Sequence, residues 1–176
     1  MKIYVISGGP CTGKTATINE LKKEFKTLPE SARQVADNDK RFIGKSIKEI
    51  NMKDFQEAIF EEQKNTLEKL KKENKNGIFF SDRGLGDTIA YYKINNLKIL
   101  NELMAYAKRF RYNGIFILDF LNFYNKDGLR QENPEEQKRI HETIIKTYEE
   151  LGYRPIKIKF ASVKERADLI KSLLKN

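Results

Sequence analysis

The feature that most constrains the fold is a glycine-rich stretch near the start of the chain, residues 8–15, which reads Gly-Gly-Pro-Cys-Thr-Gly-Lys-Thr. It fits the pattern G-x-x-x-x-G-K-S/T at every fixed position. A β-branched apolar run precedes it at residues 3–6, and apolar residues at helical spacing follow it over residues 14–26. Because a phosphate-binding loop lies between a buried strand and a helix, the sequence predicts such a loop here.

The composition of this loop predicts that it binds ATP or GTP together with Mg²⁺. Its glycines allow backbone N–H groups to point at phosphate oxygens, and the start of the next helix adds positive partial charge. Lys14 is expected to reach the β- and γ-phosphates, and the Thr15 hydroxyl to bind Mg²⁺. We expect the following residues to contact the nucleotide: Gly8, Gly9, Pro10, Cys11, Thr12, Gly13, Lys14 and Thr15.

Strands and helices alternate along the rest of the chain, which predicts an α/β fold with a mainly parallel, doubly wound sheet. Continuous apolar runs, and one alternating run near the end, predict strands at residues 3–6, 77–81, 114–119 and 156–160, with a short extended piece at 27–28. Helical spacing predicts the main helices at residues 14–26, 54–73, 87–109 and 134–151, and a last one after Ser162. A length of 176 residues fits one domain, residues 1–176.

Charge and composition narrow the class of protein. The net charge is +9, but residues 1–76 carry 16 basic and 12 acidic side chains and residues 77–176 carry 18 and 13. An even excess of this kind is typical of a solvated lysine-rich surface, so we expect no dedicated nucleic-acid groove. No run is long and apolar enough to span a bilayer, and no secretory leader is visible, so a cytoplasmic location is expected.

Two charged residues follow the predicted strand at residues 77–81. Ligands of doubly wound proteins bind beyond the carboxyl ends of the strands, so residues at this position are candidates for chemistry. Asp82 could hold Mg²⁺ through water, and Arg83 could bind the substrate or the transferred phosphate. The alternative is a surface ion pair at the end of a strand.

Glu30 follows the short extended piece and is placed near the acceptor side of the loop. It could receive the proton of a substrate hydroxyl if it comes within hydrogen-bonding reach. Alternatively, Glu30 and Arg33 belong to the first turn of a helix, where acidic residues are favoured.

Three further polar residues lie outside these two groups. The polar segment 121–133 is a candidate lid, on which Arg130 could close over the phosphates, although a solvent-facing arginine is the alternative. Arg166 is a candidate for contact with the nucleotide base, with an exposed helix arginine as the alternative. His141, the only histidine, is expected at the surface with no catalytic role.

Taken together, these motifs resemble the family of NadR/Ttd14-type AAA domains over nearly the whole chain. The matching stretches are Gly8–Thr15, Pro29–Arg33, Asp82-Arg83-Gly84 with Asp87 and Tyr91, Asp127–Arg130 and Leu151–Tyr153. The resemblance implies a P-loop NTPase fold with a five-stranded, mainly parallel sheet and helices on both faces, of nucleotide-kinase type. The family includes a ribosylnicotinamide kinase domain and eukaryotic GTP-binding, lipid-interacting members.

By similarity to deoxynucleoside kinases, the resemblance implies a role for four residues. Glu30 is implied as the acceptor-side base and Asp82 as the metal carboxylate. Arg83 is implied as a substrate-site arginine and Arg130 as the lid arginine.

The leading hypothesis from the sequence is a small-molecule kinase that transfers the γ-phosphoryl of ATP to a hydroxyl of a nucleoside-like or other metabolite. The second is an ATP- or GTP-dependent switch or slow NTPase that acts through a protein or lipid partner. A third is a catalytically silent binding module, against which Lys14, Thr15 and Asp82 argue. The sequence leaves the acceptor and the choice of nucleotide open.

Overall fold

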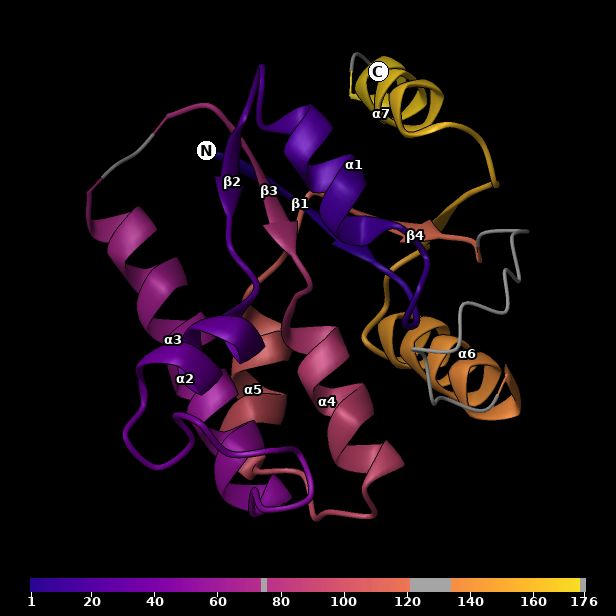
Figure 1. Cartoon of the computed structure of the whole chain (residues 1–176). Helices are drawn as coiled ribbons and strands as arrows, with labels where there is room; N and C mark the ends of the chain where they lie inside the picture. Colours follow the sequence, from indigo (N-terminus) through magenta and orange to yellow (C-terminus); the bar gives the residue numbers. More distant parts are fainter. Residues whose placement is uncertain (74–75, 121–133, 175–176) are drawn as a thin grey trace.

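Five parallel strands form one sheet in the computed structural model, which describes residues 1–73, 76–120 and 134–174. The spatial order is β2-β3-β1-β4-β5 (Figure 1). The strands are β1 (Lys2–Ser7), β2 (Lys26–Leu28), β3 (Ile78–Asp82), β4 (Gly114–Leu118) and β5 (Ile156–Ile158). Since every neighbouring pair is parallel, all five carboxyl ends lie along one edge of the sheet.

Helices cover both faces of this sheet. On one face lie α1 (Lys14–Leu21) and α7 (Val163–Leu173) (Figure 1). The other face is covered by α3 (Met52–Lys72), α4 (Leu85–Ile94), α5 (Asn101–Arg109) and α6 (Pro134–Glu150). The short helix α2 (Ser31–Asn38) packs on α3. The predicted doubly wound, five-stranded parallel sheet with helices on both faces is therefore confirmed.

The alternation of side chains along β1 explains why both faces are covered. Ile3 and Val5 belong to the core cluster under α4 and α6, whereas Ile6 belongs to the cluster under α1 and α7. A strand that is apolar on both faces exposes hydrophobic surface to water unless helices bury both sides. The continuous apolar run at residues 3–6 therefore selects a central position in the sheet.

Two predicted helices end earlier than their apolar spacing suggests. The helix predicted at residues 14–26 ends at Leu21, because residues 26–28 pair with β3. The helix predicted at residues 87–109 is two helices, interrupted where Asn96 adopts a left-handed backbone conformation with φ of 53°. The last helix begins directly after Ser162, as the sequence predicts, and its first residue, Val163, is 39% exposed.

Local hydrogen bonds and a glycine define where α7 begins and where α6 ends. Ser162 accepts a hydrogen bond from the Glu165 N–H, and the Glu165 carboxylate accepts one from the Ser162 N–H. Gly152 follows α6 with φ of 80°, as a glycine that ends a helix does. None of the helices in the described ranges is both long and apolar enough to cross a membrane.

Candidate active site

The glycine-rich loop joins the carboxyl end of β1 to the start of α1, in the position that the sequence predicts. Gly8 and Gly13 have φ values of 139° and 80°, which side chains rarely allow. A Cβ at Gly8 would lie 2.8 Å from the Leu118 carbonyl oxygen. The loop conformation therefore requires glycine at these positions.

Lys14 is buried inside the curl of the loop. Its Nζ donates hydrogen bonds to the carbonyl oxygen of Gly9 at 2.6 Å and to Thr12 Oγ1 at 3.3 Å. Burial, followed by the nearby charge of Arg83, lowers the pKa of Lys14 to about 8. Both hydrogen-bond acceptors are uncharged, so a phosphate group would supply the negative charge that a buried ammonium favours.

His141 lies against the loop, and its predicted surface position is wrong. It is 7% exposed, and its Nδ1 accepts a hydrogen bond from the Gly9 N–H at 3.1 Å. Burial lowers the pKa of His141, which favours the neutral ring that this hydrogen bond needs. The signal was present in the sequence, because residue 141 falls on the same helical stripe as Gln137, Ile144 and Tyr148.

Arg166 supports the loop from the side of α7. It is 1% exposed, and its guanidinium donates hydrogen bonds to the carbonyl oxygens of Thr12 at 2.6 Å and Asp119 at 3.1 Å. The alternative of an exposed helix arginine is therefore wrong. Contact of Arg166 with a nucleotide base stays a prediction.

Asp82 ends β3 with a buried carboxylate whose Oδ1 has no hydrogen-bond partner in the described ranges. Burial, followed by repulsion from Glu30, raises its pKa to about 6. Thr15 is exposed in the first turn of α1. The described residues contain no group of three His, Cys, Asp or Glu side chains that could hold a metal. A free carboxylate oxygen and a hydroxyl fit Mg²⁺, which takes most of its ligands from phosphates and water.

Glu30 and Arg83 form an ion pair beside the loop. Arg83 Nε donates to Glu30 Oε1 at 2.8 Å, and Arg83 Nη1 approaches the Gly8 carbonyl oxygen at 3.4 Å. Glu30 is the residue before α2, but its carboxylate makes no capping hydrogen bond with that helix. Its side chain thus turns to the site and does not merely serve the first turn of the helix.

Asp87 is a part of the site to which sequence reasoning assigned no role. It is buried, and its carboxylate accepts hydrogen bonds from Ser7 Oγ at 2.6 Å, Tyr148 Oη at 2.6 Å, Arg83 Nη1 at 3.2 Å and the Gly84 N–H at 3.0 Å. These groups come from β1, α6 and the turn after β3. Asp87 therefore fixes Arg83 relative to the phosphate loop.

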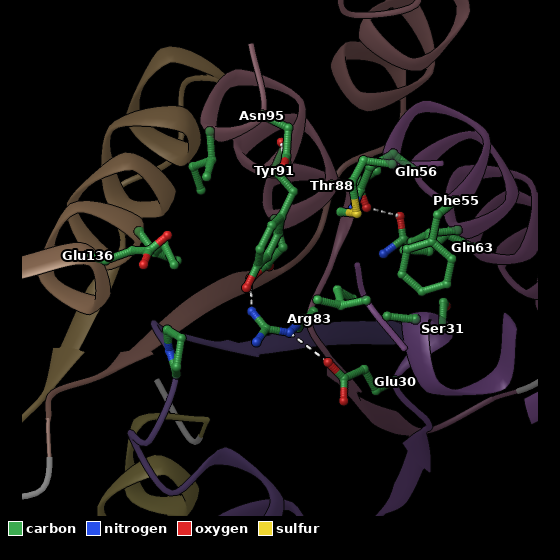
Figure 2. A pocket seen from close by; sticks show the side chains of 18 residues that line it. Glu30, Ser31, Phe55, Gln56, Gln63, Arg83, Thr88, Tyr91, Asn95 and Glu136 are labelled. Atoms are coloured by element: carbon green, nitrogen blue, oxygen red, sulfur yellow. Dashed lines mark hydrogen bonds and ion pairs between the residues drawn. The ribbon is translucent and has the colours of Figure 1, made fainter. Parts of the chain in front are cut away.

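A cavity of about 370 Å³ opens next to these groups, between α2, α3, α4 and α6 (Figure 2). Arg83 and Glu30 lie at its base, while Tyr91 and Phe55 lie on different sides of it. Pro10 of the phosphate loop is also part of its lining. The structure therefore places a largely apolar cavity directly beside the predicted phosphate site.

The candidate lid, residues 121–133, and with it Arg130, lies outside the described residues. The remaining candidates meet around the carboxyl edge of the sheet. Lys14 and Thr15 come from the loop and α1, Asp82 and Arg83 from the end of β3, and Glu30 from the start of α2.

The sheet order and the loop after β1 define a P-loop protein of nucleotide-kinase type. A family model described as an AAA domain matches residues 3–166. The chain belongs to this family, in agreement with the NadR-type resemblance of its motifs. No curated protein matches the sequence.

Solved structures share the fold at low sequence identity. A NadR protein in complex with NR has a TM-score of 0.69 and 18% identity, and the match covers 99% of this chain and 51% of that one. The chain thus spans about half of the length of that NadR protein. A thymidylate kinase from Ehrlichia chaffeensis has a TM-score of 0.66 and 14% identity over 98% of both chains. A deoxyadenosine kinase from M. mycoides with bound dATP has a TM-score of 0.57 and 16% identity over 100% of both chains.

Proposed function

We propose that this chain is a kinase that transfers the γ-phosphoryl of ATP to a hydroxyl of a small acceptor of nucleoside or metabolite type. One observation carries the proposal: the cavity and the phosphate loop share a wall. Pro10 of the loop lines the cavity, and Arg83 lines it while approaching the Gly8 carbonyl oxygen at 3.4 Å. An acceptor in the cavity would therefore lie beside the phosphates in the loop.

Phosphoryl transfer depends mainly on positioning and on neutralising charge, and the described residues can do both. The loop N–H groups and Lys14 would hold the β- and γ-phosphates, and Arg83 would stabilise the transferred group. Glu30 would accept the proton of the acceptor hydroxyl as its oxygen bonds to the γ-phosphorus. The bond from that phosphorus to the bridging oxygen then breaks, and ADP leaves with the electron pair.

Mg²⁺ fits the site through Thr15 and Asp82, together with phosphates and water. When bound, it would neutralise charge on the β- and γ-phosphates. Asp82 is suited to this because its Oδ1 accepts no hydrogen bond from the described residues. Arg166, hydrogen-bonded to the Thr12 carbonyl oxygen, would keep the loop in its binding conformation.

ATP consumption measured with a panel of nucleosides and other metabolite alcohols tests the proposal. We expect one acceptor to raise consumption and to gain one phosphoryl group in the mass spectrum. Glu30→Gln should retain ATP affinity and lose transfer, whereas Glu61→Gln, at an exposed position of α3, should retain both. Hydrolysis that no acceptor changes would contradict the kinase and favour the switch or slow NTPase with a protein or lipid partner.

A further inference from the structure

The peptide unit between Gly8 and Gly9 in the phosphate loop is bound on both sides by side chains from other parts of the chain. Arg83 Nη1 donates to the Gly8 carbonyl oxygen at 3.4 Å, and the Gly9 N–H donates to His141 Nδ1 at 3.1 Å. A trans peptide unit is planar, and its C=O and N–H point in opposite directions. Arg83 after β3 and His141 on α6 therefore hold this unit from opposite sides.

The next carbonyl oxygen of the loop binds the other cation of the site. Lys14 Nζ donates to the Gly9 carbonyl oxygen at 2.6 Å, and Thr12 Oγ1 donates to the same oxygen at 3.0 Å. Arg83 and Lys14, the two cations assigned to the phosphates, are thus bound to two successive carbonyl oxygens. The N–H between these two oxygens is the one that His141 accepts from.

The packing of α6 against Gly9 leaves His141 little freedom. A Cβ at residue 9 would lie 3.1 Å from His141 Cβ and 3.2 Å from the Gln137 carbonyl oxygen. The imidazole also lies against the ring of Phe120, with 4.8 Å between the ring centroids. A buried ring that is enclosed in this way keeps its Nδ1 in a fixed position, as a residue that orients another group must.

Two successive glycines form a flexible peptide unit, which can rotate unless its polar groups are bound. Without an acceptor at residue 141, the buried Gly9 N–H would lack a partner, and rotation toward another acceptor would remove that penalty. Such a rotation would carry the Gly8 carbonyl oxygen away from Arg83 and move the Gly9 carbonyl oxygen relative to Lys14. The loop would then lose the arrangement in which both cations meet one phosphate.

Resting on the proposed function, we propose that neutral His141 is a positioning residue for phosphoryl transfer, which fixes the Gly9 N–H and so holds the two carbonyl oxygens that align Arg83 and Lys14. The role requires the tautomer with its proton on Nε2, because Nδ1 is the acceptor. A protonated ring has no acceptor and releases the Gly9 N–H. His141 thus acts through the loop and not on the reacting atoms.

The direction of a pH effect distinguishes positioning from simple attraction of phosphate by a positive ring. Burial is the largest influence on the imidazole and lowers the pKa of His141. An imidazolium that acted only as a positive charge would bind MgATP more tightly as pH falls. A positioning role predicts the opposite, because protonation releases the loop. The charged groups that face the ring are Lys14 of the loop, Asp119 after β4, Glu142 on α6 and Lys157 on β5.

The wild-type protein, prepared without a histidine tag, allows a direct test because His141 is its only histidine. Nitrogen-15 NMR reports which ring nitrogen carries the proton and how the ring titrates. We expect an unprotonated Nδ1 at pH 7.5, and a Gly9 amide resonance that shifts with the same midpoint as the ring. A proton on Nδ1, or a Gly9 amide that does not follow the ring, would overturn the inference without any substitution.

A matched pair of variants tests the effect on the nucleotide. Asparagine can place an oxygen where Nδ1 lies and does not titrate, whereas leucine has a similar size and no acceptor. In calorimetry at pH 7.5, His141→Asn should bind MgATP within about threefold of wild type, and His141→Leu about fivefold to tenfold more weakly. Phosphoryl transfer at saturating MgATP should fall in His141→Leu and recover in His141→Asn.

The ratio of the MgATP dissociation constants of wild type and His141→Asn isolates the histidine, because both proteins keep Asp82 and bind the same nucleotide. This ratio should be near one at pH 7.5. As pH falls through the midpoint that NMR gives for the ring, the ratio should rise toward the loss of about fivefold to tenfold expected for His141→Leu. A ratio that stays constant, or that falls with pH, contradicts a positioning role.

The outcomes separate this inference from the proposed function. Equal MgATP affinities for the leucine and asparagine variants would overturn the inference and leave the kinase in place. The expected binding pattern without phosphorylation of any acceptor would contradict the kinase, and His141 would then position the loop for nucleotide binding alone. A wild-type protein that does not bind MgATP would overturn both.

Discussion

Arg166 on the last helix donates a hydrogen bond to the carbonyl oxygen of Thr12 in the phosphate loop, 2.6 Å away. The two residues are 154 positions apart in the sequence, and the same guanidinium also binds the Asp119 carbonyl oxygen after β4. Three segments at the carboxyl edge of the sheet are thereby joined through one side chain. The shape of the loop thus depends on α7 as well as on its own glycines.

Replacing Arg166 with methionine should weaken nucleotide binding through the loop. Hydrogen bonds from charged donors contribute about 1.5–3 kcal/mol each, so we expect a fall of about tenfold or more in MgATP affinity. Lysine at this position should restore part of the loss. Calorimetric titration with MgATP measures both, and Lys164→Met, at an exposed position of α7, is the control. Equal affinities for the Arg166 and Lys164 variants would contradict a supporting role.

Replacement by asparagine should change the free energy of unfolding in opposite directions at Asp82 and at Asp87. Burial raises the pKa of Asp82 to about 6, so its ionised form destabilises the ligand-free fold at neutral pH, and Asp82→Asn should stabilise it by about 1–3 kcal/mol. The Asp87 carboxylate accepts hydrogen bonds from Ser7, Arg83, Gly84 and Tyr148. Asp87→Asn should therefore destabilise the fold by about 3 kcal/mol or more. Urea unfolding at pH 7.5 in EDTA measures both free energies.

The raised pKa of Asp82 determines how the free energy of unfolding depends on pH. A carboxyl group with a higher pKa in the folded state binds more protons there, so it stabilises the fold as pH falls from about 6 toward its unfolded value of 3.8. The stability advantage of Asp82→Asn should accordingly be full above pH 6 and disappear near pH 4. An advantage that stays constant over this range would show that the carboxylate is not strained by burial.

The phosphate loop and the strands were predictable because their signals are local. The pattern of residues 8–15 and the apolar runs at residues 3–6, 77–81 and 114–119 each specify a conformation within a few neighbouring residues. The ion pair between Glu30 and Arg83 joins residues 53 positions apart. Its geometry follows from the pairing of β2 with β3, which places the start of α2 near the end of β3 and which no local pattern specifies.

The hydrogen-bond network around Asp87 could not be predicted from the sequence for the same reason. Its partner Ser7 lies 80 positions away and Tyr148 lies 61 positions away. The sequence showed an acidic residue in the first turn of α4, where such residues are common. His141 was different, because its place on the buried stripe of α6 could be read from the sequence.

The hydrogen bond from Gly9 to His141 should make the loop sensitive to pH. Burial lowers the pKa of His141, and a protonated ring cannot accept from the Gly9 N–H. A base with a lowered folded pKa loses its stabilising effect as pH falls below its unfolded value of 6.5. His141→Phe should therefore cost about 1–3 kcal/mol at pH 7.5 and less near pH 5. Urea unfolding of the wild-type protein and of His141→Phe measures this cost at each pH. Because both proteins keep Asp82, the difference between their free energies of unfolding cancels the opposite pH effect of that residue.

Gly86 on α4 approaches the ring of Tyr148 on α6 closely enough to exclude a methyl group. A Cβ at this position would lie 2.5 Å from Tyr148 Cε1. Glycine to alanine within a helix normally stabilises by about 1 kcal/mol, whereas forcing an atom into a packed core costs about 1–3 kcal/mol. Tyr148 is fully buried and its hydroxyl is bound to Asp87 at 2.6 Å, so the ring cannot swing away without breaking that hydrogen bond.

We therefore expect Gly86→Ala to lower the free energy of unfolding by about 1–2 kcal/mol, against the ordinary effect of alanine in a helix. Because the displaced Tyr148 loosens Asp87 and with it Arg83, phosphoryl transfer should fall more than MgATP affinity. Tyr148→Leu removes the clashing ring, so combining it with Gly86→Ala should cost less than the sum of the two single variants. Additive costs in urea unfolding would show that the glycine serves some purpose other than admitting this ring.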